Sequence, residues 1–174
     1  MPPDTFFFAF CALIAALLVE TVLSARWNRA YFRSGFLVFS KRISPAGMAP
    51  ALPSPSALEM AVKSTWLPSL VFHQLSLSEL AFRERLFEFR LFSYTPVMHG
   101  LIECRGAEHL ILVQGRLNWS TVLFILFFAL GPAREVWFVV LPFLAGVLAV
   151  IYAFQASRYR RVVAALASGS GAPA

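Results

Sequence analysis

Three histidines and a cysteine are the residues of this chain that could support metal or nucleophilic chemistry. His73, His99, Cys104 and His109 all lie in the central part of the sequence. Imidazole and thiolate groups are the usual zinc ligands, but these residues show none of the close pairings typical of zinc sites. In a regular strand His99 and Cys104 would also point to opposite faces. We therefore predict no metal site.

Cys104 beside a histidine could instead form a nucleophile and base pair, but the sequence gives no further sign of one. It contains no P-loop, no G-x-G-x-x-G and no H-E-x-x-H motif. No histidine lies in an apolar run, which argues against haem ligation inside a membrane helix. The only other cysteine, Cys11, lies in such a run, so we expect no disulfide. We predict no catalytic residue, no cofactor and no enzymatic activity.

Glu20 is the only charged residue in the apolar run from Thr5 to Leu23. A carboxylate at membrane depth is costly and by default suggests function. However, Glu20 lies close to Arg26, so the simpler interpretation is an interfacial carboxylate that is solvated or paired with an arginine. A proton relay would need more ionisable groups at membrane depth, and the later apolar runs supply none.

The elements that must position these residues are dominated by long apolar runs. Hydrophobic residues make up 59% of the 174 residues, more than an ordinary soluble domain contains. The runs at 5–23, 117–131 and 136–154 predict three transmembrane helices, the last two forming a helical hairpin over 117–154. Residues 117–131 cover only about 22 Å as a helix. That run could cross a thinned bilayer, begin earlier or be re-entrant, and we favour a full crossing.

Small and aromatic residues of the hairpin predict its packing. Alanine recurs every fourth residue in the last run, and such a stripe lets helices approach closely in lipid. Tryptophans lie at the ends of the runs, where interfacial aromatic residues belong. The residues predicted to pack against the membrane or a partner are Trp119, Trp137, Ala145, Ala149 and Ala153.

Basic clusters predict the topology. Arginines follow the first and the last apolar runs, so the positive-inside rule places the N-terminus outside and the C-terminus inside the cell. The arginines predicted to contact lipid headgroups are Arg26, Arg29, Arg33, Arg158, Arg160 and Arg161. Small residues at 22–25 would suit signal-peptide cleavage, but the preceding segment lacks positive charge and the run is long. We predict a retained helix and a multi-pass protein of the inner (plasma) membrane.

A small cytoplasmic domain is predicted at 25–116, between the first helix at 1–24 and the hairpin, and residues 155–174 are predicted as a cytoplasmic tail. Residues 43–55 are rich in proline and predict an irregular connector. Ser56 and Glu59 have capping-box spacing, which predicts a short helix over 56–63. Alternation predicts strands at 36–39, 87–91, 97–104 and 109–114, the last two forming a hairpin. Residues 78–90 also fit a helical face, and we choose strand. The predicted domain is a mostly antiparallel α+β fold.

These features favour an accessory or assembly subunit of a larger bacterial-type membrane protein complex, with other membrane subunits and lipids as partners. The alternative is a membrane-tethered module that binds or senses a lipid or peptide through its aromatic residues. A lipid-modifying membrane enzyme is a remote alternative. The basic clusters lack the density and fold context of a nucleic-acid-binding module, so we predict no nucleic-acid partner.

Overall fold

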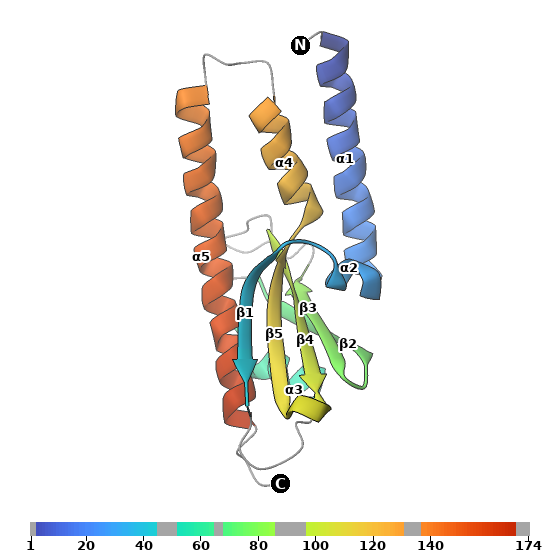
Figure 1. Ribbon diagram of the computed structural model, residues 1–174, viewed down its shortest axis with the longest axis vertical. Helices are drawn as coiled ribbons and strands as arrows, with labels where there is room; N and C mark the ends of the chain where they lie inside the picture. The colour runs from blue at the N-terminus through green and yellow to red at the C-terminus, as the bar shows by residue number, and fades with distance from the viewer. Residues whose placement is uncertain (1–2, 45–51, 65–67, 86–96, 131–136, 170–174) are drawn as a thin grey trace.

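The computed structural model describes residues 3–44, 52–64, 68–85, 97–130 and 137–169. The helices in chain order are α1 (Pro3–Ala25), α2 (Arg29–Arg33), α3 (Pro55–Ala61), α4 (Trp119–Leu130) and α5 (Trp137–Gly169). The strands are β1 (Leu37–Ile43), β2 (Leu70–Ser76), β3 (Glu79–Glu84), β4 (Met98–Arg105) and β5 (Leu110–Leu117). Figure 1 shows an elongated molecule, with α1, α4 and the first half of α5 at one end and the sheet at the other.

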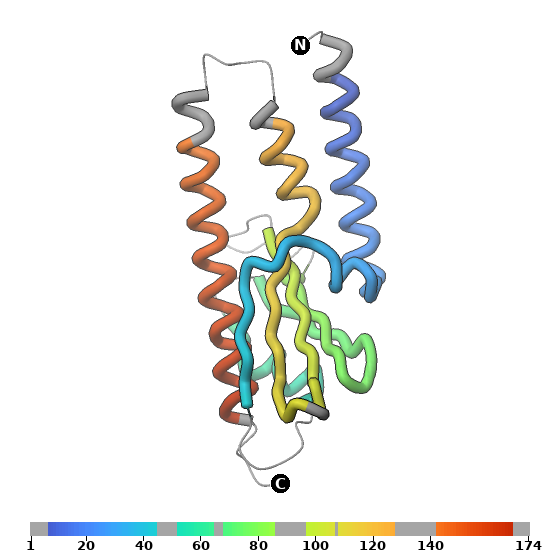
Figure 2. Tube along the Cα trace, viewed as in Figure 1, coloured from blue at the N-terminus to red at the C-terminus, as the bar shows by residue number. Residues whose placement is uncertain are grey.

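The five strands form one antiparallel sheet in the order β1-β5-β4-β3-β2. Strands β2 to β5 follow one another as a meander, and the β4–β5 turn contains a short 3₁₀ helix at Gly106–Glu108. β1 is added against β5 from far earlier in the chain, and Figure 2 shows it as the cyan trace beside the yellow one. Among the described residues, the sheet therefore ends at β1 on one side and at β2 on the other.

The main core lies between one face of the sheet and the helices α3 and α5. Side chains from the second half of α5 contact every second residue of the strands, because alternate strand residues point to the same face of a sheet. The largest fully buried apolar side chains there are Tyr159, Val162, Phe82, Leu80, Met98, Ile102 and Val113. A smaller cluster on the opposite face joins α2 to the sheet through Tyr31, Phe32, Ala81 and Leu101.

Two glycines on neighbouring strands leave room for aromatic rings of the main core. Gly100 and Gly115 are register partners in β4 and β5. A Cβ atom on Gly115 would lie 2.6 Å from the Tyr159 ring, and one on Gly100 would overlap the Phe82 ring. The two rings lie 4.7 Å apart between their centroids. The missing side chains thus leave a trough that these rings fill.

Filling this trough with a methyl group should destabilise the fold. We expect Gly100→Ala to lower the free energy of unfolding by about 1 to 3 kcal/mol, because overpacking forces the Phe82 ring out of its position. Gly106→Ala is the matched control, since nothing lies within 4 Å of the added Cβ atom. Chemical denaturation followed by circular dichroism measures both variants, and equal stabilities would contradict this account of the trough.

The predicted three-span integral membrane fold is wrong. Among the described residues, one helix (Phe7–Ala25) is long and apolar enough to cross a membrane. α4 has 12 residues and is about 18 Å long, short of a hydrocarbon core of roughly 30 Å. α5 does not end with its apolar run but continues as one helix of 33 residues, and its second half packs on the sheet. The structure is a small α+β protein with a five-stranded antiparallel sheet.

Several local predictions are confirmed and others change. The hairpin of β4 and β5 forms as predicted, and the strand interpretation holds for 79–84. The short helix forms as α3, but Ser54 rather than Ser56 caps it by accepting from the Ala57 amide. The segment predicted as a tail is the second half of α5. The strand predicted at 87–91 lies outside the described residues.

Candidate functional site

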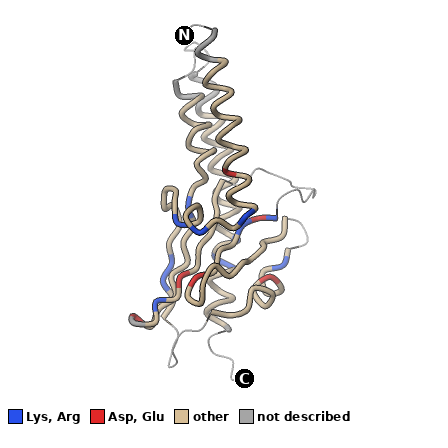
Figure 3. The backbone as a smooth tube through the Cα atoms, turned by 90° about the vertical axis from the view of Figure 1, so that its right-hand side faces the viewer, with Lys and Arg blue, Asp and Glu red and all other residues tan. Residues whose placement is uncertain are grey.

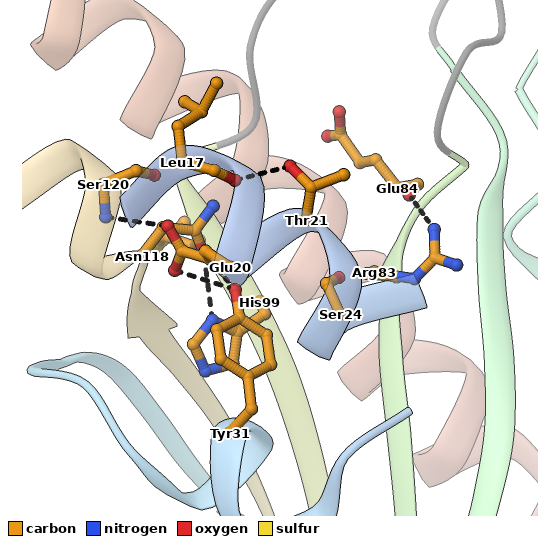
Figure 4. Close-up of a pocket in the computed structure, with 11 residues that line it drawn as sticks. Leu17, Glu20, Thr21, Ser24, Tyr31, Arg83, Glu84, His99, Asn118 and Ser120 are labelled. Atoms are coloured by element: carbon orange, nitrogen blue, oxygen red, sulfur yellow. Dashed lines mark hydrogen bonds between the residues drawn. The ribbon is translucent and has the colours of Figure 1, made fainter. Parts of the chain in front are cut away.

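Four polar side chains meet where α1, α2, β4 and the start of α4 come together. They are Glu20, Tyr31, His99 and Asn118, and we call them the Glu20 cluster. A cavity of about 170 Å³ lies beside them. Figure 4 shows α1 crossing one side of this cavity, with the side chain of Glu20 directed toward Ser120 and Tyr31. The cluster lies at the junction between the helical end and the sheet.

Glu20 closes the N-terminus of α4. Its carboxylate accepts hydrogen bonds from the backbone amides of Trp119 (2.8 Å) and Ser120 (2.7 Å). The first amides of a helix have no partner within the helix, and the helix dipole favours a negative charge at this end. Glu20 is 8% exposed, so these bonds compensate for its burial. The interpretation of Glu20 as a solvated or arginine-paired carboxylate is therefore corrected.

Tyr31 links the same carboxylate to the sheet. Its hydroxyl donates to Glu20 Oε1 at 3.0 Å, and its ring packs on His99 with centroids 4.5 Å apart. Burial, together with the nearby Glu20 carboxylate, raises the pKa of Tyr31 far above its usual range. The phenol therefore stays protonated and acts as a fixed donor. Asn28 caps α2 by accepting from the Tyr31 amide, which holds this residue in place.

His99 is buried beneath Tyr31 with both ring nitrogens in contact with protein oxygens. Nδ1 lies 2.9 Å from Asn118 Oδ1, and Nε2 lies 3.2 Å from the Ser34 carbonyl oxygen. The ring is 2% exposed, and burial lowers the pKa of His99. Because neither nitrogen is left for a substrate, this geometry suits a residue that joins elements better than a general base.

This lowered pKa makes stability depend on pH. In the unfolded chain His99 has its ordinary pKa of about 6.5. Below that pH the unfolded state binds a proton that the folded state does not, so the folded chain loses stability as pH falls. We expect the melting temperature to drop between about pH 8 and pH 5.5, and His99→Gln to flatten this dependence. The exposed His109 provides the control, and a slope that survives His99→Gln but vanishes in His109→Asn would contradict the assignment.

The other predicted chemical groups are dispersed. His73 stacks on Trp27 at 5.0 Å, and His109 adopts a left-handed conformation after the 3₁₀ turn. Burial raises the pKa of the Cys104 thiol, which favours the less reactive protonated form. Within the described parts of the chain, no three His, Cys, Asp or Glu side chains are grouped to hold a metal ion.

The predicted contact of the packing residues with the membrane or a partner stays a prediction. Ala145, Ala149 and Ala153 lie on an exposed face of α5. Trp119 is partly exposed, packs on Phe36 and donates from its indole nitrogen to Ser34 Oγ at 3.1 Å. The side chain of Trp137 lies outside what the structure describes.

Five of the six predicted headgroup arginines are exposed, and Arg158 is buried. Arg26, Arg160 and Arg161 are exposed. Arg29 and Arg33 both pair with Glu79, and the hydrogen bond from Arg29 is the main cause of the lowered pKa of Glu79. Arg158 is only 3% exposed and pairs with Glu84 at 2.6 Å, so the prediction of headgroup contact fails for this residue.

Sequence reasoning identified Glu20 but missed its partners. Asn118 precedes an apolar run, as a helix-capping residue would, and that was the available signal. No sequence pattern indicated that Tyr31 or Arg83 belongs to this site. Arg83 lines the cavity, lies over the Trp27 ring at 4.6 Å and donates to the Glu84 carbonyl oxygen. Its buried Nε atom has no hydrogen-bond partner among the described residues.

Comparison with family models, curated proteins and solved structures finds no match to this chain.

Proposed function

We propose that this chain is an accessory or assembly subunit of a protein complex in the inner (plasma) membrane, attached through α1. The observation that supports this proposal is the uncovered apolar surface of the helical end. Large apolar side chains remain open to solvent along α1 and α4, including Phe7, Phe8, Phe10, Leu18, Val19, Ile125 and Leu126. A surface of this kind is typical of an interaction site.

The distribution of charge agrees with attachment at one end. Figure 3 shows the basic and acidic residues gathered mainly over the sheet half of the molecule. Only 11% of the apolar stretch of α1 is buried, so α1 does not resemble a core helix of a soluble protein. The bonds of Glu20 to α4 also tie α1 to the rest of the fold, which favours a retained anchor over a cleaved signal sequence.

Native mass spectrometry of the full chain, extracted from its own membranes in mild detergent, tests this function. A defined heteromeric mass is the expected result, and a lone monomer would overturn the proposal. Phe8→Ser and Leu18→Ser should reduce the heteromeric fraction, since both side chains are exposed on α1. Leu77→Ser is the matched control, because Leu77 is 94% exposed at the β2–β3 turn, far along the chain from α1.

A second candidate function is the binding of a lipid or another small ligand beside the Glu20 cluster. The cavity of about 170 Å³ and the unpartnered Nε of Arg83 favour it. Leu17 and Met98 add apolar lining. In the same mass spectra, a monomer that carries extra small-molecule mass would support this function. Loss of that mass in Arg83→Gln, but not in the exposed Arg160→Gln, would place the ligand in the cavity.

A further inference from the structure

The two edge strands of the sheet, β1 and β2, differ in how they are covered. At the β2 edge, α3 packs alongside the strand and Glu59 accepts a hydrogen bond from the outward-facing Phe72 amide at 3.0 Å. Covering an edge in this way prevents another strand from pairing with it. At the β1 edge, α5 packs on the core side of the strand through the rings of Phe39 and Tyr159. Among the described residues, the one side-chain bond to an outward backbone group of β1 is from the Tyr152 hydroxyl to the Val38 carbonyl oxygen, 3.2 Å long.

The register shows which backbone groups of β1 point outward. The Leu117 amide donates to the Phe36 carbonyl oxygen, so odd-numbered residues of β5 direct their hydrogen bonds toward β1. Their partners are Phe39 (opposite Gly115) and Lys41 (opposite Val113). Hydrogen-bonding direction alternates along a strand, so Ser40 and Arg42 direct their amide and carbonyl groups away from the sheet. Among the described residues, these outward groups have no hydrogen-bond partner.

The surface beside this edge is basic. Lys41 and Arg42 are exposed, and no carboxylate of the described residues lies within ion-pair distance of either. The sequence has no Asp or Glu between Glu20 and Glu59, so the segment itself supplies no counter-charge. An added strand with acidic side chains would satisfy both the backbone groups and the two cations.

We propose that the β1 edge accepts an extended acidic segment of a partner protein as a sixth strand of the sheet. This inference rests on the proposed function and specifies how the partner binds. A second copy of this chain fits less well, because pairing β1 with itself adds the same two basic residues and no acidic one.

Photo-crosslinking in native membranes tests the proposal directly. The photoreactive residue p-benzoylphenylalanine is placed at Ser40 or at Arg42, with Leu77 as the control position. The expected result is an adduct at 40 and 42, absent at 77, whose crosslinked peptide comes from another protein and carries several acidic residues. Adducts with lipid or with a second copy only, or no adduct while the heteromeric mass is present, would overturn the proposal.

Substitutions at the edge provide a second measurement. Ser40→Pro removes an outward amide without breaking the bonds to β5, and Ser40→Ala is its control. We expect Ser40→Pro, and separately the double change Lys41→Glu with Arg42→Glu, to lower the heteromeric fraction at least about tenfold, with Ser40→Ala unchanged. Circular dichroism confirms that each variant is folded. If these variants keep the wild-type heteromeric fraction, the edge proposal fails while the proposed function stands; if the wild-type chain is a monomer, the function itself fails.

Discussion

Replacing Arg158 by methionine is expected to lower the free energy of unfolding by about 3 to 5 kcal/mol, the largest effect of any single change considered. Arg158 Nη1 donates to Glu84 Oε1 at 2.6 Å, and both side chains are 4% exposed. A second guanidinium nitrogen donates to the Pro68 carbonyl oxygen. Removing the cation leaves a buried carboxylate that has lost its charge partner, although it still accepts the longer bond from Gln155, at 3.3 Å.

Neighbouring arginines on α5 provide the control for this prediction. Arg160→Met and Arg161→Met alter exposed residues of the same helix, so we expect changes within about 0.5 kcal/mol. The measurement is chemical denaturation of the full chain in mild detergent. The double variant Arg158→Met with Glu84→Gln should recover part of the loss, because no uncompensated charge remains. If Arg158→Met were as stable as Arg160→Met, the ion pair would not hold α5 to the sheet.

Glu20→Ala is expected to cost about 2 to 4 kcal/mol, because three donors lose the carboxylate that accepts from them, although the Tyr31 hydroxyl keeps a longer contact with Asn118 Oδ1 at 3.4 Å. These donors are the amides of Trp119 and Ser120 and the hydroxyl of Tyr31. Glu20→Gln should cost less, since the side-chain amide oxygen of glutamine can still accept from some of these donors. Besides the free energy of unfolding, hydrogen exchange should show faster exchange at the Trp119 and Ser120 amides.

Thr21 offers a matched control on the same turn of α1. Its hydroxyl donates to the Leu17 carbonyl oxygen within the helix, and the residue is half-buried beside the cavity. Thr21→Ala is expected to change the stability by no more than about 0.5 kcal/mol and to leave exchange in α4 unaltered. Unchanged exchange at Trp119 in Glu20→Ala would show that the carboxylate does not close α4.

The sequence was most informative where a pattern is local. Alternation and the Gly106 turn were sufficient to predict the β4–β5 hairpin, because both strands and their connection lie within about twenty residues. The spans were misjudged because hydropathy shows that a run is apolar but not where its helix begins and ends: β5 extends to Leu117, which leaves α4 only 12 residues. Nothing near 154 signals that α5 continues unbroken into a face that packs on the sheet.

The candidate site was harder to predict because its contacts join distant segments. Glu20 stood out as a charge in an apolar run, but its partners Trp119 and Ser120 lie about 100 residues away. Arg158 is a second example. The sequence suggested an arginine that sets the membrane topology, whereas in the fold it pairs with Glu84. A charge pattern in the sequence can identify a charged residue in an apolar context, but only the fold shows which partner compensates its charge.

The long separation between Glu20 and α4 also has a consequence for biosynthesis. Glu20 precedes Trp119 by 99 residues, and at about 5 to 20 residues per second this stretch takes roughly 5 to 20 s to synthesise. During that time the carboxylate has emerged without the helix terminus it will bind, and β1 likewise waits for β5. The segment made first therefore cannot dock until α4 begins, and a ribosome stalled before Trp119 would display a chain whose first helix still carries an unpaired charge.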